Sequence, residues 1–385
     1  MCRILRGKRT TMYIRQFYKE RIAEASYFLD CNGEAAVIDP TRDVEQYLAL
    51  AAKRKTTIRY IFETHFHADF ISGHLDLAAA TGATIVFGPT ATPGFTATVA
   101  ADGTRFPIGD HALQLLHTPG HSLESVCYLL HDATGRAKAV FTGDTLLIDG
   151  VGRADLVKEI RAELTPAFLA GLLYDSIQNK LAPLADDVIV YPGHGKGSLC
   201  GSQIGSAAPE SMGHQRMSNF ALRPGLTREQ FIAQCTRNAD CIPPYFPFNM
   251  LANASGTITP AGQAVDNGIR SLEPEQFAWV IQNEDACIVD TRPAEEYNRC
   301  HIRGSLHVPF DEHFHLHAGH LLPDTRRPIL LVNRPQQALA VVKQLLSIGY
   351  QQLAGCLYGG IASWEEAGMP LQRAPHPQKT GTGEK

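Results

Sequence analysis

No stretch of the sequence is apolar for long enough to cross a membrane, because a transmembrane helix needs about 20 predominantly apolar residues in a row. The basic start, MCRILRGKRTTMYIRQF, also lacks the apolar core and the small-residue cleavage site of a secretory signal. We therefore expect a soluble protein with no membrane partner. Residues 1–11 are interpreted as an N-terminal extension, with Met12 as an alternative true start.

The sequence also lacks closely spaced cysteine pairs and an excess of positive charge. The nine cysteines are an odd number and form no CxxC pair, so a disulfide framework is not expected and a reducing cytoplasm fits best. The net charge of −4 provides no positive field to hold a phosphate backbone, which argues against nucleic acid as a partner.

The pattern along the chain is that of an α/β protein with two domains. A length of 385 residues suits two domains at about 100–200 residues each. Strand-like and helix-like segments alternate at the start, with strands expected at 34–40 and 57–63 and helices at 43–55 and 71–82. Such alternation is typical of sheets covered by helices.

The domain boundaries are predicted from composition. A first domain is expected over residues 12–254, and a second, smaller α/β domain over 271–373. The segment NASGTITPAGQAVDNG is small, polar and contains both Gly and Pro, so residues 255–270 are interpreted as the linker between them. Residues 374–385 read as a polar tail.

Residues of the type that bind metals follow the predicted strands of the first domain. His65 and His67 come directly after one strand, and His121, Asp144 and His194 follow three others. Loops at one end of adjacent strands converge, so these side chains can meet in space. A set of two histidines and one carboxylate with open positions suits non-haem Fe(II), whereas fuller His/Asp sets suit hydrolytic zinc.

The motifs THxHxD, TPGHS, FTGDTL and YPGHG resemble those of the metallo-β-lactamase superfamily in order and approximate spacing, over residues 13–205. The resemblance implies an αβ/βα sandwich with the metal site at the edge where the two sheets meet. In two-metal hydrolases of the superfamily, such as glyoxalase II, the first motif continues to THxHxDH. Phe70 replaces that final histidine and has no lone pair to offer, so one metal is expected here.

A site with one metal is similar to that of the persulfide dioxygenases of this superfamily. The resemblance implies one Fe(II) per chain, with zinc as the alternative. It assigns His67, Asp69 and His194 to orienting ligands and waters by hydrogen bonds. The metal ligands implied by motif position are His65, His121 and Asp144.

Two further residues near these motifs, Arg153 and Cys200, each have two possible roles. The segment GVGRADL resembles one in the persulfide dioxygenases and suggests that Arg153 lies near the substrate, while pairing with Asp155 is the structural alternative. Cys200 lies in a loop similar to that of members fused to rhodanese domains. It is expected either near the mouth of the site or as a buried structural cysteine.

The second domain resembles rhodanese, on the segments CIVDTRPAEEYNRCHIRGSLHVPF and GGIASWEEAGMPL. An active rhodanese places a cysteine directly after the central strand, in a loop that cradles the anionic persulfide. Asn333 occupies that position here, and an asparagine cannot carry a sulfane sulfur. We therefore predict a small rhodanese-like α/β domain that is catalytically inactive.

Three functions remain open from the sequence. The first is an iron-dependent dioxygenase that oxidises a low-molecular-weight persulfide, such as glutathione persulfide, with O2 to sulfite and a free thiol. The second is a glyoxalase II-like zinc thioesterase, and the third is a non-catalytic persulfide sensor or scaffold. A homodimer is the default expectation for assembly.

Overall fold

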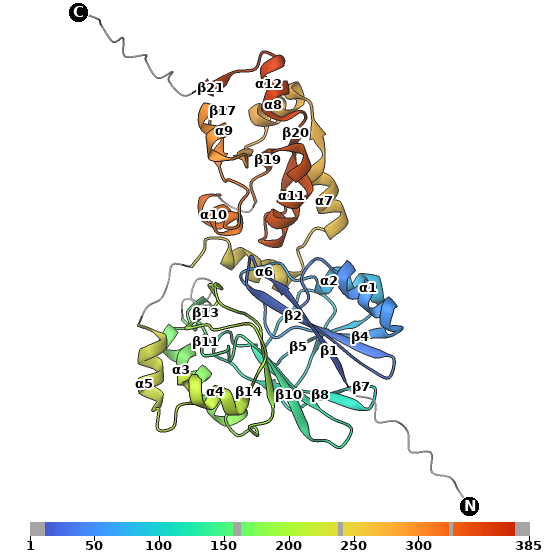
Figure 1. The fold of residues 1–385 in the computed structure, drawn as a ribbon, viewed down its shortest axis with the longest axis vertical. Coiled ribbons are helices and arrows are strands. Elements are labelled where there is room, and N and C mark those ends of the chain that lie inside the picture. The colour runs from blue at the N-terminus through green and yellow to red at the C-terminus, as the bar shows by residue number, and fades with distance from the viewer. Residues whose placement is uncertain (1–11, 157–162, 238–241, 323–325, 374–385) are drawn as a thin grey trace, which may run out of the picture. The chain divides into compact units, whose positions relative to one another are not determined.

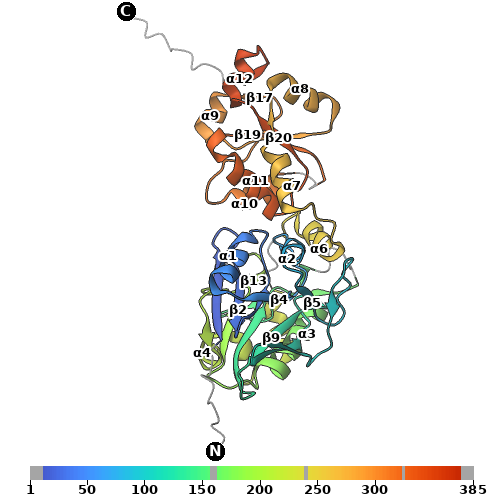
Figure 2. The same cartoon turned by 90° about the vertical axis from the view of Figure 1, so that its right-hand side faces the viewer.

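The computed structural model describes residues 12–156, 163–237, 242–322 and 326–373 (Figures 1 and 2). The expected N-terminal extension and polar tail lie outside the described residues. The chain divides into two compact units, the first ending at Ile258 and the second beginning at Thr259. No helix among the described segments combines the length and the apolar character that a membrane crossing requires.

The first unit contains two six-stranded sheets. The sheet formed by the earlier part of the chain has the strand order β1-β2-β3-β4-β5-β6 and is antiparallel at its start and parallel from β3 onward. Its strands are β1 (Tyr13–Lys19), β2 (Glu24–Cys31), β3 (Glu34–Ile38), β4 (Thr57–Phe62), β5 (Thr84–Phe87) and β6 (Thr98–Val99).

The second sheet has the order β14-β12-β10-β9-β8-β7 and is antiparallel except where β10 pairs with β12. A separate two-stranded ribbon pairs β11 (Val151–Gly152) with β13 (Gly201–Ser202). The strands of the second sheet are β7 (Arg105–Ile108), β8 (His111–His117), β9 (Val126–His131), β10 (Ala137–Gly143), β12 (Ile189–Pro192) and β14 (Glu210–Ser211).

Alternation along the strands explains why the two sheets pack face to face. In β9, Tyr128 and Leu130 belong to the core between the sheets, whereas Cys127 and Leu129 belong to the core beneath the outer helices. Successive side chains of a strand point to opposite faces, so a strand buried on both faces is apolar throughout.

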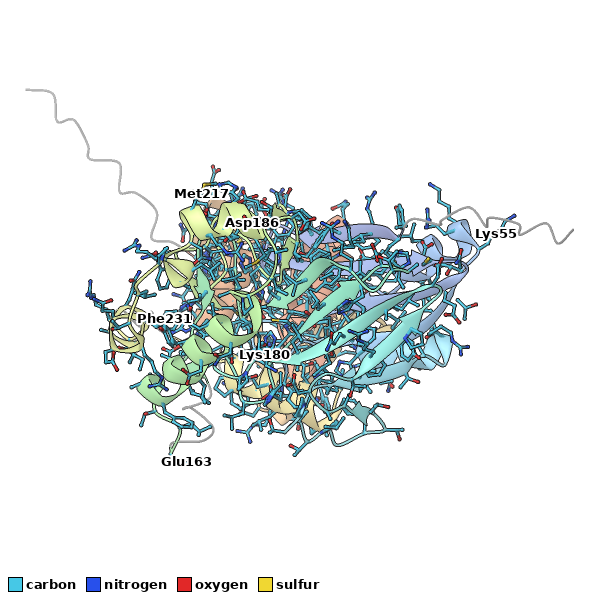
Figure 3. The ribbon with its side chains drawn as sticks, turned by 90° about the horizontal axis from the view of Figure 1, so that it is seen from below. Lys55, Glu163, Lys180, Asp186, Met217 and Phe231 are labelled. Carbon is cyan, nitrogen blue, oxygen red and sulfur yellow. The ribbon has the colours of Figure 1, made fainter. Side chains whose placement is uncertain are left out.

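Helices cover the outer face of each sheet, which confirms the predicted αβ/βα sandwich. Residues of α1 and α2 pack on the first sheet, and residues of α3, η2, α4 and α5 pack on the second. Figure 3 labels Lys180 on η2, Met217 on α4 and Phe231 on α5, outside the second sheet. The helices are α1 (Glu45–Arg54), α2 (His74–Thr81), α3 (Pro166–Ser176), the π-helical turn η2 (Ile177–Leu181), α4 (Met212–Ser218), the 3-10 turn η3 (Phe220–Leu222), α5 (Arg228–Cys235) and α6 (Phe246–Ser255).

The second unit is a five-stranded parallel sheet, in the order β15-β20-β19-β16-β18, together with a two-stranded ribbon of β17 and β21. It matches the small α/β domain predicted for this part of the chain. Its elements are α7 (Ala261–Ile269), β15 (Ser271–Leu272), α8 (Pro274–Asn283), β16 (Cys287–Asp290), α9 (Ala294–Arg299), β17 (Cys300–Ile302), β18 (Leu306–His307), α10 (Phe314–Leu321), β19 (Ile329–Val332), η4 (Pro335–Gln337), α11 (Ala338–Ser347), β20 (Leu353–Leu357), α12 (Gly360–Glu366) and β21 (Leu371–Arg373).

Most of the segment interpreted as a linker, residues 255–270, is instead helical. Helix α7 packs against α11 and β20, with Ala264 and Gly268 buried. A Cβ added at Gly268 would lie 2.7 Å from Cγ1 of Val342 and 2.8 Å from Cδ1 of Leu353. The small residues that suggested flexibility therefore serve close packing of a helix.

This packing predicts different effects for two glycines of α7. Gly268→Leu should destabilise the second unit by about 1–3 kcal/mol, because the added atoms overpack a filled interface. Gly262→Ala should be neutral or slightly stabilising, since nothing lies within 4 Å of a Cβ added there and alanine favours helix. Urea unfolding of both variants measures the difference. Equal stability of the two variants would contradict the docked helix.

Candidate metal centre

Four strand ends bring the predicted site residues together. His65 lies just after β4 of the first sheet, while His121, Asp144 and His194 follow β8, β10 and β12 of the second. The two sheets thus meet at the site, as the motif resemblance implied. Each of these four residues is at most 3% exposed.

The three predicted ligands direct their donor atoms at one another. One donor atom from each of His65, His121 and Asp144 lies within 4.8 Å of the other two. Oδ2 of Asp144 is 3.4 Å from Nε2 of His121 and 3.9 Å from Nε2 of His65. This oxygen is buried and accepts no hydrogen bond. Leaving a buried carboxylate oxygen without a partner is costly, and a divalent cation between the three donors would satisfy it.

Hydrogen bonds at Nδ1 orient both histidines. Nδ1 of His121 donates to the carbonyl oxygen of Arg153 at 2.8 Å. The Thr64 hydroxyl donates to Asp39 at 2.9 Å, so its oxygen accepts from Nδ1 of His65, also at 2.9 Å. Each histidine thereby offers the lone pair of Nε2 to the site. Burial also lowers the pKa of His65 well below its usual value, which keeps this ring neutral.

His194 positions the carboxylate of Asp144. Its Nδ1 lies 2.7 Å from Oδ1 of Asp144, and its Nε2 lies 2.9 Å from Oδ2 of Asp69. Burial alone would raise the pKa of Asp144, but His194 and His121 bring it below its usual range, so this group is ionised. Both ring nitrogens of His194 are engaged by carboxylates. The predicted orienting role of His194 and Asp69 fits this arrangement.

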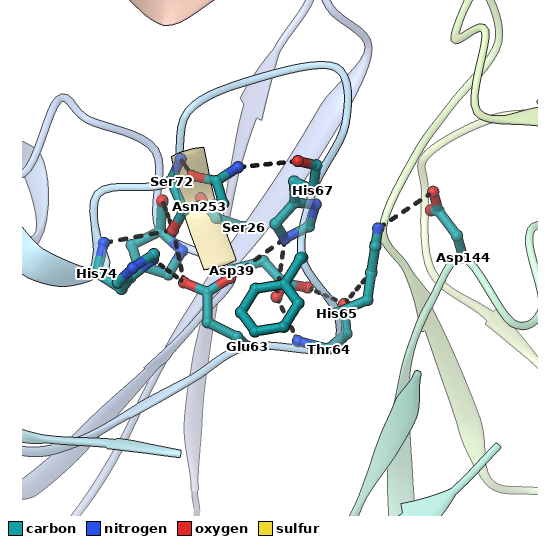
Figure 4. A network of polar contacts seen from close by, with 12 residues as sticks. Ser26, Asp39, Glu63, Thr64, His65, His67, Ser72, His74, Asp144 and Asn253 are labelled. Atoms are coloured by element: carbon teal, nitrogen blue, oxygen red, sulfur yellow. Dashed lines mark hydrogen bonds and ion pairs between the residues drawn. The ribbon is translucent and has the colours of Figure 1, made fainter. Parts of the chain in front are cut away.

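His67 has a different environment from the one expected for a residue that orients the ligands. Its Nε2 lies 3.1 Å from Asp39 and 3.4 Å from Glu63 (Figure 4). The ring centroid is 4.3 Å from that of Phe70, whose side chain is 1% exposed. His67 therefore directs Nε2 at two buried carboxylates and not at Asp144. Hydrogen bonds from His67 and His74 lower the pKa of Glu63 to about 2, although burial alone would raise it.

In the structure, Arg153 pairs with Asp155, which is the structural alternative given for it above. The guanidinium pairs with Asp155 through contacts of 2.6 and 2.8 Å and donates to the carbonyl oxygen of Leu199 at 3.1 Å. The contribution of this position to the site comes from its backbone, which holds His121. Cys200 is buried and not at a mouth, and its sulfur lies within 4.8 Å of donor atoms of Asp69 and His194.

Asn253 is a site residue that no sequence pattern indicated. Its amide nitrogen, on α6, donates to the carbonyl oxygens of His67 and Phe70 at 2.8 and 2.9 Å, and its Oδ1 accepts from the backbone N–H of Ser72 at 3.0 Å (Figure 4). These bonds fix the loop after β4. A residue more than 180 positions away carries no local signal, whereas Asp39 could have been found as the polar end of a buried strand.

Comparison with known protein families finds two matches in the chain. The metallo-beta-lactamase superfamily matches residues 22–194, and the rhodanese-like domain matches residues 273–367. The first match contains all six predicted ligand and orienting residues in the loops described above.

The curated relatives are named as hydrolases. The chain is 31% identical to a probable hydroxyacylglutathione hydrolase, glo2, from Schizosaccharomyces pombe, over 44% of this chain and 62% of that protein. It is 39% identical to a hydroxyacylglutathione hydrolase from Brucella anthropi, over 38% of this chain and 51% of that protein. The chain thus covers less than two thirds of the length of these relatives.

Two solved structures are similar over longer spans. A metallo-beta-lactamase from Staphylococcus aureus subsp. aureus COL aligns with a TM-score of 0.77 and 27% identity, covering 90% of this chain and 98% of that one. ETHE1 from Myxococcus xanthus aligns with a TM-score of 0.53 and 29% identity, covering 63% of this chain and 99% of that one. The first of these likenesses extends across both units.

The ligand assignment predicts loss of metal on truncation of one histidine. His121→Ala should remove stoichiometric iron, because two remaining donors are a poor set for Fe(II). His214→Ala, at an exposed position on α4, should retain it. Iron content after anaerobic loading and desalting measures both. Full retention of iron in His121→Ala would contradict the assignment.

Proposed function

Because this chain carries a metallo-β-lactamase domain followed by a rhodanese-like domain, we propose that it oxidises a low-molecular-weight persulfide with O2 at a single iron. The observation that carries the proposal is the convergence of one set of three metal-binding side chains. His65, His121 and Asp144 converge, while Phe70 stands where two-metal hydrolases have a further histidine. The likeness to ETHE1 from Myxococcus xanthus supports the same reading.

The residues of the site suit one divalent iron. His65, His121 and Asp144 would hold it, and the bound ion would supply redox chemistry and open coordination positions for small molecules. His194 fixes the Asp144 carboxylate, and Asn253 fixes the loop that carries His65. The surrounding side chains are buried, which limits the access of water to a reacting sulfur.

The overall reaction is balanced with water as the third reactant. A persulfide RSSH, O2 and H2O give the thiol RSH and sulfurous acid, which ionises to sulfite. The S–S bond breaks, the two sulfurs together lose four electrons, and O2 gains them. Glutathione persulfide is the proposed substrate class, and a homodimer is the proposed assembly.

The second candidate is a zinc thioesterase that acts on a glutathione thioester. The names of the curated relatives favour it, as do the donor atoms of Asp69, His194 and Cys200, which lie within 4.8 Å of one another. A two-metal hydrolase uses both ions to activate water and stabilise the developing charge. The loss of a ligand at Phe70 weakens that mechanism.

The rhodanese-like domain supports the proposal without contributing sulfur transfer. Asn333 follows β19 directly and is buried, and its side-chain nitrogen donates to the carbonyl oxygen of Arg334 at 2.9 Å. An amide is not a nucleophile and cannot form a persulfide. Cys356 lies within β20, where burial raises its pKa to about 12, so it does not substitute.

The test is oxygen uptake by protein loaded anaerobically with Fe(II), on addition of glutathione persulfide. We expect rapid uptake with one sulfite formed per O2, and none in His121→Ala. S-lactoylglutathione is offered to the zinc-loaded protein in parallel. Thioester hydrolysis without oxygen uptake would favour the hydrolase, and the absence of both activities with metal bound would favour a sensor or scaffold.

A further inference from the structure

A second group of metal-binding side chains lies outside the site described above. The Cys31 sulfur is 2.9 Å from Oδ1 of Asp110 and 3.3 Å from Nδ1 of His111. The same two atoms of Asp110 and His111 are 3.5 Å apart. The side chain of Asn32 donates to Oδ1 of Asp110 at 2.8 Å and holds it in place. A thiol, an imidazole and a carboxylate thus form one closed triangle.

This triangle lies far from the candidate metal centre. Glu24, at the start of β2, pairs with His194 at that centre, whereas Cys31 is the last residue of β2. His111 begins β8, the strand that runs toward His121. Strands of seven or eight residues span about 20 Å or more, so the two groups occupy opposite ends of the sandwich. Lys55, labelled in Figure 3, precedes β4 at the same end as Cys31.

The triangle joins the two sheets. Cys31 belongs to the first sheet, whereas Asp110 lies in the turn between β7 and β8 of the second sheet and His111 is the first residue of β8. The turns approach closely, since the N–H of Gly109 donates to Glu34 at 3.0 Å and a Cβ at Gly109 would lie 2.6 Å from the carbonyl oxygen of Cys31. A cation held here would tie both sheets together at their open end.

The distances suit tetrahedral zinc. Bonds of about 2.3 Å to sulfur, 2.0–2.1 Å to imidazole nitrogen and 2.0–2.2 Å to a carboxylate oxygen place those atoms about 3.3–3.6 Å apart. The separations of 3.3 and 3.5 Å that involve His111 are close to these values, and the sulfur–carboxylate separation of 2.9 Å would have to widen by about 0.7 Å. The Asp110 side chain is 40% exposed, so the fourth position can be reached from solvent.

We propose that Cys31, Asp110 and His111 form a structural zinc site, separate from the iron-type centre and with a different metal preference. A thiolate favours Zn2+ over Fe2+, and at a given set of ligands zinc also binds more tightly than iron. Binding replaces the S–H proton of Cys31 by the metal and releases that proton to solvent. The site takes Zn2+ and neither substrate nor O2.

The experiment is a titration of the metal-free full-length protein with Co2+, which reports a thiolate ligand through a sulfur-to-cobalt charge-transfer band. The ligands proposed for iron, two histidines and an aspartate, cannot produce this band. We expect it in the wild-type protein, displaced by added Zn2+, and absent in Cys31→Ser. The band should remain in Cys200→Ser and in Cys235→Ser, whose cysteines lie outside the triangle.

A second variant keeps the test valid if Cys31→Ser fails to fold. Asp110 is exposed, so Asp110→Asn should fold normally and weaken Zn2+ binding by about tenfold or more through loss of the charged ligand. Absence of the band in the wild-type protein, or its persistence in Cys31→Ser, would overturn the proposal. A band lost only in Cys200→Ser would also overturn it, by placing the thiolate ligand beside His194.

Discussion

The Asp144 carboxylate is the group on which the rest of the site depends. One oxygen is held by His194, and the other lies without a hydrogen bond between Nε2 of His121 and Nε2 of His65. Burying a charged carboxylate is costly unless each of its two oxygens has a hydrogen-bond donor or a cation beside it. His194 compensates the first, and a divalent cation would compensate the second. The strand ends of both sheets are positioned to make that possible.

Under the proposed function, Phe70 limits this site to one metal. It packs on His67, which turns its Nε2 toward Asp39 and Glu63. The surroundings of His67 thus consist of an apolar ring and two buried carboxylates. The names of the curated relatives point to a hydrolase, whereas the ligand set proposed here suits an oxygenase. Fold alone does not decide between them.

Sequence patterns predicted the features of this structure that depend on residues close together in the chain. Residues that end strands could be recognised from apolar runs, and the three predicted ligands indeed converge. Contacts between distant segments left no such signal, as in the hydrogen bonds of Asn253 or the triangle of Cys31, Asp110 and His111. The boundary between the two units falls inside the predicted linker, but the helix α7 within it was not predicted, because its small residues are explained only by their packing against another helix.

The most direct test of the account is the magnetic state of iron in the protein loaded anaerobically with excess Fe(II), measured by Mössbauer spectroscopy. We expect isolated high-spin Fe(II) in the wild-type protein and in Phe70→Leu, which also lacks a lone pair at this position. Phe70→His should gain a second, coupled iron. An exchange-coupled pair of irons in the wild-type protein would contradict the claim that Phe70 makes this centre mononuclear.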